Sequence, residues 1–190
     1  MKIGIDARVL FRFRTGIGLS LEHILMRLQE LDTKNYYILF SNRDFQLEMR
    51  NSKWKKVIYN GRFGRVGSLW LQLDLPALVD GEGIDLFWGH EFTIPLLLKK
   101  KIKTLVTVHD LTYKYFPESM TLYNYLMNRF FVPRSIKRST AVIADSNATK
   151  EAILKEFPGT KAEKVNVLYY ASALTKVKPS TKRIVDGSYI

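Results

Sequence analysis

The chain has 190 residues, a length that supports one well-filled core or at most two small ones. Hydrophobic residues make up 46% of it and charged residues 25%, which is ordinary for a globular domain and gives a disordered or fibrous protein no support. The sequence has no cysteine, which excludes disulfides, thiolate metal sites and a cysteine nucleophile. It shows no signal-peptide pattern and no apolar run near the roughly 18 residues that span a bilayer. We therefore expect a cytoplasmic protein that is not integral to a membrane.

The formal net charge of +12 requires either an anionic partner or a solvated basic face. Nucleic acid, anionic lipid and phosphorylated small molecules are all partners that such a charge suits. Basic residues cluster at Lys99–Lys101 and Lys103, and again at Arg8, Arg12 and Arg14 around a glycine loop. Weak peripheral contact with an anionic membrane is one expectation from this charge.

Strands and helices alternate along the chain. Short apolar runs predict strands at 3–6, 36–40, 57–59, 84–88, 104–108, 141–144 and 165–169. Helical spacing and caps predict helices at 17–31, at 68–79 with Ser68 as cap, at 121–131 before Pro133, and at 146–157 with Ser146 as cap. This order predicts an α/β fold, a single Rossmann-like doubly wound parallel sheet.

The composition changes near the C-terminus. Residues 172–186 are dominated by Lys, Ser, Thr and Pro, which is typical of a linker. The last four residues look like the beginning of another strand. We therefore expect one domain over residues 1–171, followed at 172–190 by a linker and the start of a second domain.

Polar residues follow several predicted strands, at the sheet edge where open α/β folds bind ligands. They are Asp6 and Arg8, His90 and Glu91, His109 and Asp110, and Asp145 and Ser146.

The segment Thr15-Gly16-Ile17-Gly18 opens the first predicted helix. Glycine there lets backbone N–H groups approach a phosphate at a helix N-terminus. The dinucleotide fingerprint is incomplete, because Leu21 stands where its third glycine belongs. A simple turn and an anion site therefore remain open for this segment.

His109 at the end of a central strand has the chemistry to donate a hydrogen bond to a sugar or phosphate, or to act as acid or base. The alternative is a structural histidine satisfied by Asp110. No second histidine or carboxylate stands at metal-ligand spacing, so we expect no metal. Ser146 either caps its helix or adds a second anion contact. Three aromatic residues either line an acceptor groove or close a loop onto the core: Tyr113, Tyr115 and Phe116.

These segments, taken in order, resemble family 4 glycosyltransferases, especially the mannosyl- or rhamnosyltransferase-like members. The similar stretches run through nearly the whole chain: 3–8, 15–18, 35–40, 107–113, 116–118, 141–146 with Thr149 and Lys150, and 164–170. One departure is Ala171, where the family usually has glycine.

The resemblance implies the N-terminal, acceptor-side domain of a GT-B enzyme whose C-terminal domain holds the nucleotide sugar and a Glu-x7-Glu element. It implies retention of anomeric configuration, no metal and no cofactor, and a glycan or lipid-linked acceptor. His109 would be catalytic, contacting the transferred sugar. The phosphate- and substrate-binding residues would be Gly16, Gly18, Arg8, Asp110, Ser146 and Thr149. Since the C-terminal domain that carries the Glu-x7-Glu element in the family is absent from this sequence, we expect the chain alone to be inactive.

Two alternatives remain at the level of sequence. One is a basic binding module for nucleic acid or anionic lipid, although nucleic-acid signatures such as paired Cys and His are missing from the sequence. The other is one subunit of a split transferase whose donor domain is a separate chain.

Overall fold

The computed structural model describes residues 1–11 and 16–170. Thr15 and the expected linker at 172–190 lie outside the described residues. Within them the strands form a seven-stranded sheet in the order β3-β2-β1-β4-β5-β6-β7. Every neighbouring pair is parallel. The strand bounds are β1 Lys2–Asp6, β2 Tyr36–Ser41, β3 Trp54–Ile58, β4 Leu86–Gly89, β5 Lys103–Val108, β6 Ala141–Ala144 and β7 Val165–Val167.

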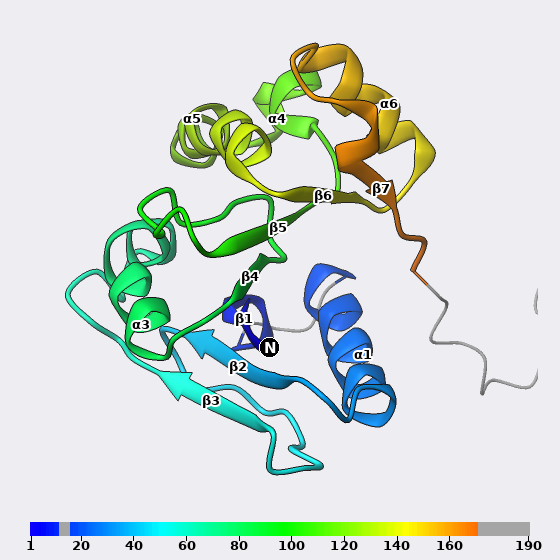
Figure 1. The fold of residues 1–190 in the computed structure, drawn as a ribbon. Coiled ribbons are helices and arrows are strands. Elements are labelled where there is room, and N and C mark those ends of the chain that lie inside the picture. The colour runs from blue at the N-terminus through cyan, green and yellow to red at the C-terminus, as the bar shows by residue number, and fades with distance from the viewer. Residues whose placement is uncertain (12–15, 171–190) are drawn as a thin grey trace, which may run out of the picture.

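The helices connect these strands and cover both faces of the sheet (Figure 1). Their bounds are α1 Gly16–Leu31, α2 Gly67–Leu69, α3 Leu75–Gly81, α4 Thr112–Tyr115, α5 Leu122–Arg138 and α6 Asn147–Glu156. A π-helix, η2 (Trp70–Asp74), joins α2 to α3, and short 3-10 turns lie at η1 Arg8–Phe11, η3 Pro117–Ser119 and η4 Ala162–Lys164.

The alternation of side chains along each strand produces two hydrophobic cores. In β2, Ile38 and Phe40 enter the core formed with α2–α3, α5 and α6, whereas Tyr37 and Leu39 enter the core formed with α1. Successive strand residues point to opposite faces, so apolar residues throughout a strand require helices on both sides. The predicted doubly wound fold is therefore confirmed.

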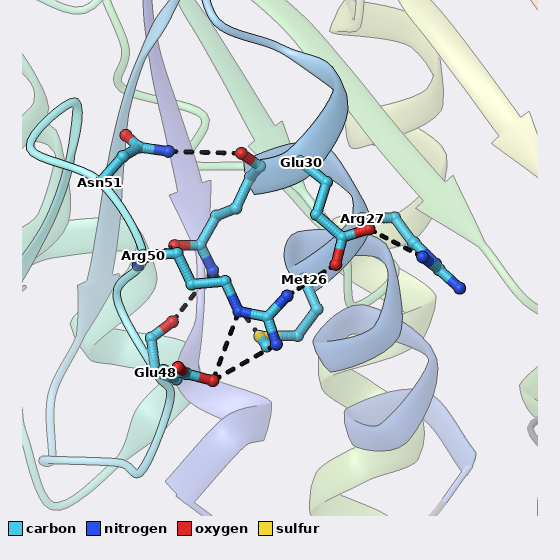
Figure 2. Close-up of polar contacts among 7 residues, drawn as sticks. Met26, Arg27, Glu30, Glu48, Arg50 and Asn51 are labelled. Atoms are coloured by element: carbon cyan, nitrogen blue, oxygen red, sulfur yellow. Dashed lines mark hydrogen bonds and ion pairs between the residues drawn. The ribbon is translucent and has the colours of Figure 1, made fainter.

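The 12-residue connection from β2 to β3 is held against α1, and Figure 2 shows its Arg50 beside Glu30 of the helix. The buried Gln29 amide donates to the Glu48 carbonyl at 3.0 Å and accepts from the Arg50 N–H at 2.7 Å. Arg50 also pairs with Glu30 at 2.6 Å. A buried amide satisfied on both sides thus fixes a segment that has no regular structure of its own.

Several expected boundaries were wrong, including the start of β4, the end of β7 and those of α2, α5 and β3. Helix α2 begins after Val66, and no side chain, including that of Ser68, caps it. Helix α5 continues through Pro133 to Arg138, because burial of Val132 and Ile136 anchors the turn that the proline weakens. Strand β3 starts at Trp54, whose buried ring stacks on Tyr37 at 4.0 Å between centroids.

Candidate active site

Two histidines lie in contact at the carboxyl edge of the sheet, one after β4 and one after β5. The rings of His90 and His109 meet edge-to-face with centroids 5.0 Å apart. His90 is completely buried and His109 is 9% exposed. Burial, reinforced by the adjacent His109, lowers the pKa of His90 to about 3, so His90 is neutral at physiological pH.

The hydrogen bond of His109 fixes which ring nitrogen remains for a ligand. Its Nε2 lies 2.9 Å from the His90 carbonyl oxygen, which only accepts, so Nε2 carries the proton. The other nitrogen, Nδ1, lies 3.8 Å from the Asp145 carboxylate, too far for a direct hydrogen bond. Nδ1 is therefore the atom of His109 that can contact a substrate.

Helix α6 begins directly beside His109. The Ser146 hydroxyl caps this helix by accepting from the Thr149 N–H at 3.1 Å. The buried Thr149 hydroxyl lies 3.0 Å from the His109 carbonyl oxygen and 3.0 Å from the Asp145 carboxylate. The same hydrogen-bonded network, centred on Thr149, thus caps α6 and positions the backbone of His109.

Asp110 does not reach His109. Its carboxylate accepts from the Thr112 N–H at 2.8 Å and its side chain is exposed. The carboxylate near His109 is Asp145, one strand further along the chain. The alternative of a histidine satisfied by Asp110 is therefore wrong.

Helix α1 brings the two glycines of its first turn to the same edge. The Ser20 hydroxyl, in the next turn, lies 3.4 Å from His90 Nε2. A Cβ at Gly18 would lie 3.0 Å from the Val9 carbonyl oxygen, whereas one at Gly16 would meet nothing within 4 Å. Gly18 is thus required by packing against η1, and Gly16 faces open space.

Arg8 is held by the protein. It pairs with Asp6 through two hydrogen bonds of 2.7 and 2.8 Å and donates to the Gly67 carbonyl at 2.6 Å. Burial opposes its charge, yet the Asp6 carboxylate raises the pKa of Arg8 above its usual value. Glu91 lies 3.9 Å away. The guanidinium therefore ties the end of β1 to the first residue of α2.

A groove of about 720 Å³ opens beside these residues. Its walls are the segment 65–68 with Leu71 and Gln72, the segment 91–93, and the first turns of α5, and Arg8 lies at its base. Phe92 lines the groove and also contacts His109 edge-to-face, with centroids 5.3 Å apart. The Tyr123 and Ser68 hydroxyls hydrogen bond to each other between α5 and α2. The Phe92 ring thus lies between the groove and His109.

Phe92 has a φ of 58°, in the left-handed region that aromatic residues rarely adopt. Such strain persists only where the surrounding structure enforces it, and it is concentrated at functional sites.

For two residues at this edge the sequence suggested no contact with the histidines, although Asp145 was among the polar residues expected there. The Tyr170 ring lies 5.9 Å from that of His109 and 6.4 Å from that of His90, and Asp145 faces His109 Nδ1. The sequence feature that could have pointed to Asp145 was its position as a polar residue directly after a predicted strand. Tyr170 follows the last strand, and no local pattern shows that its ring folds back over the histidines.

Of the two roles expected for the aromatic residues after Asp110, only packing onto the core is seen, and only for Tyr113. Tyr113 is buried in the core, whereas Tyr115 and Phe116 are exposed. None of the three lines the groove at His109. In the described residues no group of three or more His, Asp or Glu side chains is arranged to hold a metal ion.

The parallel sheet, with polar residues gathered at the carboxyl ends of its strands, defines the class of protein: it is a Rossmann-like α/β domain. The family described as Glycosyltransferase Family 4 matches residues 15–171, and the chain belongs to this family. The expected family and fold class are therefore confirmed. No curated protein matches the chain.

Solved glycosyltransferases share the fold. The lipopolysaccharide outer core galactosyltransferase WaaB is 13% identical with a TM-score of 0.55, and the match covers 96% of this chain and 50% of WaaB. HepE of Anabaena, solved with UDP and glucose, is 18% identical with a TM-score of 0.54, covering 95% and 47%. The wall teichoic acid polymerase TagF is 16% identical with a TM-score of 0.54, covering 89% and 38%. The chain thus spans half or less of the length of these neighbours.

Proposed function

We propose that this chain is the acceptor-binding half of a retaining, metal-independent glycosyltransferase. The whole enzyme moves a sugar from a nucleotide-sugar donor to a glycan or lipid-linked acceptor. The observation that carries this proposal is that His109, whose Nδ1 is the ring nitrogen left for a ligand, contacts Phe92 in the wall of the groove. In support of the donor type, the structural neighbour HepE was solved with UDP and glucose.

Each residue at the edge has a proposed role. His109 contacts the transferred sugar through Nδ1, next to the reacting carbon. The exposed backbone at Gly16, next to the buried Gly18, and the N-terminus of α6 at Ser146 and Thr149 favour the negative charge of the donor diphosphate.

Two further residues act on the acceptor side. Arg8 shapes the groove wall by holding the Gly67 carbonyl, so its effect on acceptor binding is indirect. The exposed Asp110 carboxylate is available to accept hydrogen bonds from substrate hydroxyls.

We propose that the opposite wall of the site comes from a second domain, which holds most of the nucleotide sugar. Closing that domain over His109 would expel water and strengthen the electrostatic contacts with the donor. The part of the sugar nucleotide that this chain contacts is then the diphosphate and the reacting end of the sugar.

The test is turnover of a panel of nucleotide sugars by the two-domain protein and its His109→Ala variant. Losing one well-placed hydrogen bond to the reacting sugar lowers kcat by about 10²–10³ fold. His23→Ala is the matched control, because His23 is an exposed residue of α1. Equal turnover of the His109 variant and the parent would remove His109 from the site, and an inverted product would contradict the retaining mechanism.

A further inference from the structure

Helix α5 carries an apolar stripe that faces away from the core. Leu122, Leu126 and Phe130 are 72%, 47% and 47% exposed. Their spacing of four residues places them on one face of the helix, whereas Val132 and Ile136 bury another face in the core. Three large apolar side chains exposed in a row are unusual on a protein surface.

Basic side chains surround the stripe. Residues 119–144 contain no Asp or Glu, and α5 carries Arg129, Arg134, Lys137 and Arg138. The described residues provide no carboxylate that forms an ion pair with Arg129, Arg134 or Lys137. This contrasts with the basic cluster before β5, where Lys99 pairs with Asp80 at 2.7 Å.

The arginines lie over the apolar rings. The Arg134 guanidinium is 3.6 Å from the centroid of the Phe130 ring, and that of Arg129 is 5.8 Å from the Tyr125 ring. A long stem along an apolar surface with a charged head at its end suits the boundary between lipid tails and headgroups.

The same helix forms a wall of the groove. Asn124, Asn128 and Phe131 line the groove from a face of α5 next to the stripe. Figure 1 shows α5 at the periphery of the molecule, alongside α4. A surface that rested on the stripe would therefore lie beside the mouth of the groove.

We propose that the outer face of α5 is a membrane-contact surface for an anionic lipid bilayer. Leu122, Leu126 and Phe130 insert at the level of the headgroups, and Arg129, Arg134 and Lys137 contact the lipid phosphates. Charge complementarity selects this occupant, because the charged residues of α5 are all basic and an apolar stripe beside them matches a negatively charged surface. The proposal extends beyond the transferase activity, since it concerns where the enzyme meets its acceptor.

The experiment measures co-sedimentation of the 190-residue chain with vesicles of phosphatidylcholine, alone or mixed with phosphatidylglycerol. We expect binding only to the mixed vesicles, weakening as salt rises. Leu126→Glu/Phe130→Glu should weaken it by about tenfold or more, because insertion is lost and two negative charges are added. Leu31→Glu/Tyr36→Glu is the matched control, since it changes one exposed leucine and one exposed aromatic elsewhere.

The basic residues are tested separately. Arg129→Gln/Arg134→Gln should weaken binding, whereas Lys100→Gln/Lys101→Gln, which removes the same charge from the cluster before β5, should have a much smaller effect. Circular dichroism of each variant shows that it is folded.

A second readout locates the inserted residue. Because the chain has no cysteine, Leu126→Cys and Leu31→Cys each create one site for an environment-sensitive fluorophore. A blue shift on adding mixed vesicles is expected only for the label at position 126.

The proposal is overturned if Leu126→Glu/Phe130→Glu binds the mixed vesicles as well as the parent chain does. It is also overturned if binding is equal on both vesicle types, or if only the fluorophore at position 31 shows a blue shift. A concentration-dependent dimer that Leu126→Glu/Phe130→Glu abolishes would also overturn it, because the outer face of α5 would then be a contact with a second copy of the chain. None of these readouts depends on sugar transfer, so failure of the membrane surface and failure of the proposed activity are distinguishable.

Discussion

At the residue scale, His90 and His109 acquire different chemistry from different surroundings. His90 is sealed between α1 and the sheet, whereas His109 reaches the surface and keeps Nδ1 for a ligand. The His90 carbonyl determines the tautomer of His109, so the first histidine acts on the second through its backbone.

The buried neutral His90 predicts a specific pH dependence of stability. Its pKa is about 3 when folded and 6.5 when unfolded, so the unfolded chain binds the additional proton. The stabilisation is complete above pH 6.5 and is lost as pH falls toward 3, by up to about 1.4 kcal/mol per pH unit.

Urea unfolding between about pH 7 and pH 5 measures this slope, over a range in which carboxylates of ordinary or lowered pKa stay ionised. His90→Gln should flatten the slope of the unfolding free energy against pH, whereas His23→Gln, on the exposed face of α1, should leave that slope unchanged. An unchanged slope in His90→Gln would mean that another group titrates.

Ser146 has a capping role in the structure and a proposed role in anion binding, and two substitutions separate them. Ser146→Ala removes the cap of α6 and should lower the free energy of unfolding by about 1 kcal/mol. Ser146→Asp preserves a good cap but places a negative charge where the donor diphosphate is proposed to bind. We expect Ser146→Asp to unfold like the parent and to raise the KM for the nucleotide sugar in the two-domain protein. An unchanged KM would leave Ser146 with capping alone.

At the element scale, the first turn of α1 depends on a close approach to η1. Gly18→Ala places a methyl group 3.0 Å from the Val9 carbonyl oxygen. Overpacking of this kind costs about 1–3 kcal/mol, and the better helix propensity of alanine returns about 0.5–1 kcal/mol. We expect a net loss of stability of about 1 kcal/mol in chemical denaturation.

Gly16→Ala is the matched control, because a Cβ there meets nothing within 4 Å. It should leave stability unchanged or slightly increased. Equal destabilisation by both substitutions would show that backbone freedom, not the contact with η1, requires glycine.

The strands and long helices were predictable from sequence because apolar periodicity reflects burial, which is local information. The misplaced boundaries depended on tertiary contacts. Trp54 begins β3 because it stacks on Tyr37, and α5 passes Pro133 because Val132 and Ile136 are buried. Strand order likewise placed His109 at the ligand edge, yet Asp145 could not be chosen over Asp110 without knowing which way each side chain points.

At the scale of the whole molecule, the site described has one wall. We expect the 190-residue chain alone to give no sugar transfer above background and to bind nucleotide sugars weakly. With one side of the site open, water screens each charge and hydrogen bond that the chain directs at the donor. The check is to assay the chain beside the two-domain protein with the same donor panel, and calorimetry reports donor binding directly. Turnover by the chain alone would contradict the proposed division of the site.

The strand order has a further consequence, for synthesis of the protein. Strand β1 ends at Asp6 and pairs with β2, but its other neighbour, β4, begins only at Leu86. While the ribosome adds the residues between β3 and β4, the nascent sheet β3-β2-β1 presents β1 as a bare edge. Unpaired edges of apolar strands recruit other chains, and partly made α/β proteins are vulnerable for this reason. A strand that is paired on both sides in the finished sheet is therefore an exposed edge during translation, open to unwanted pairing until β4 is made.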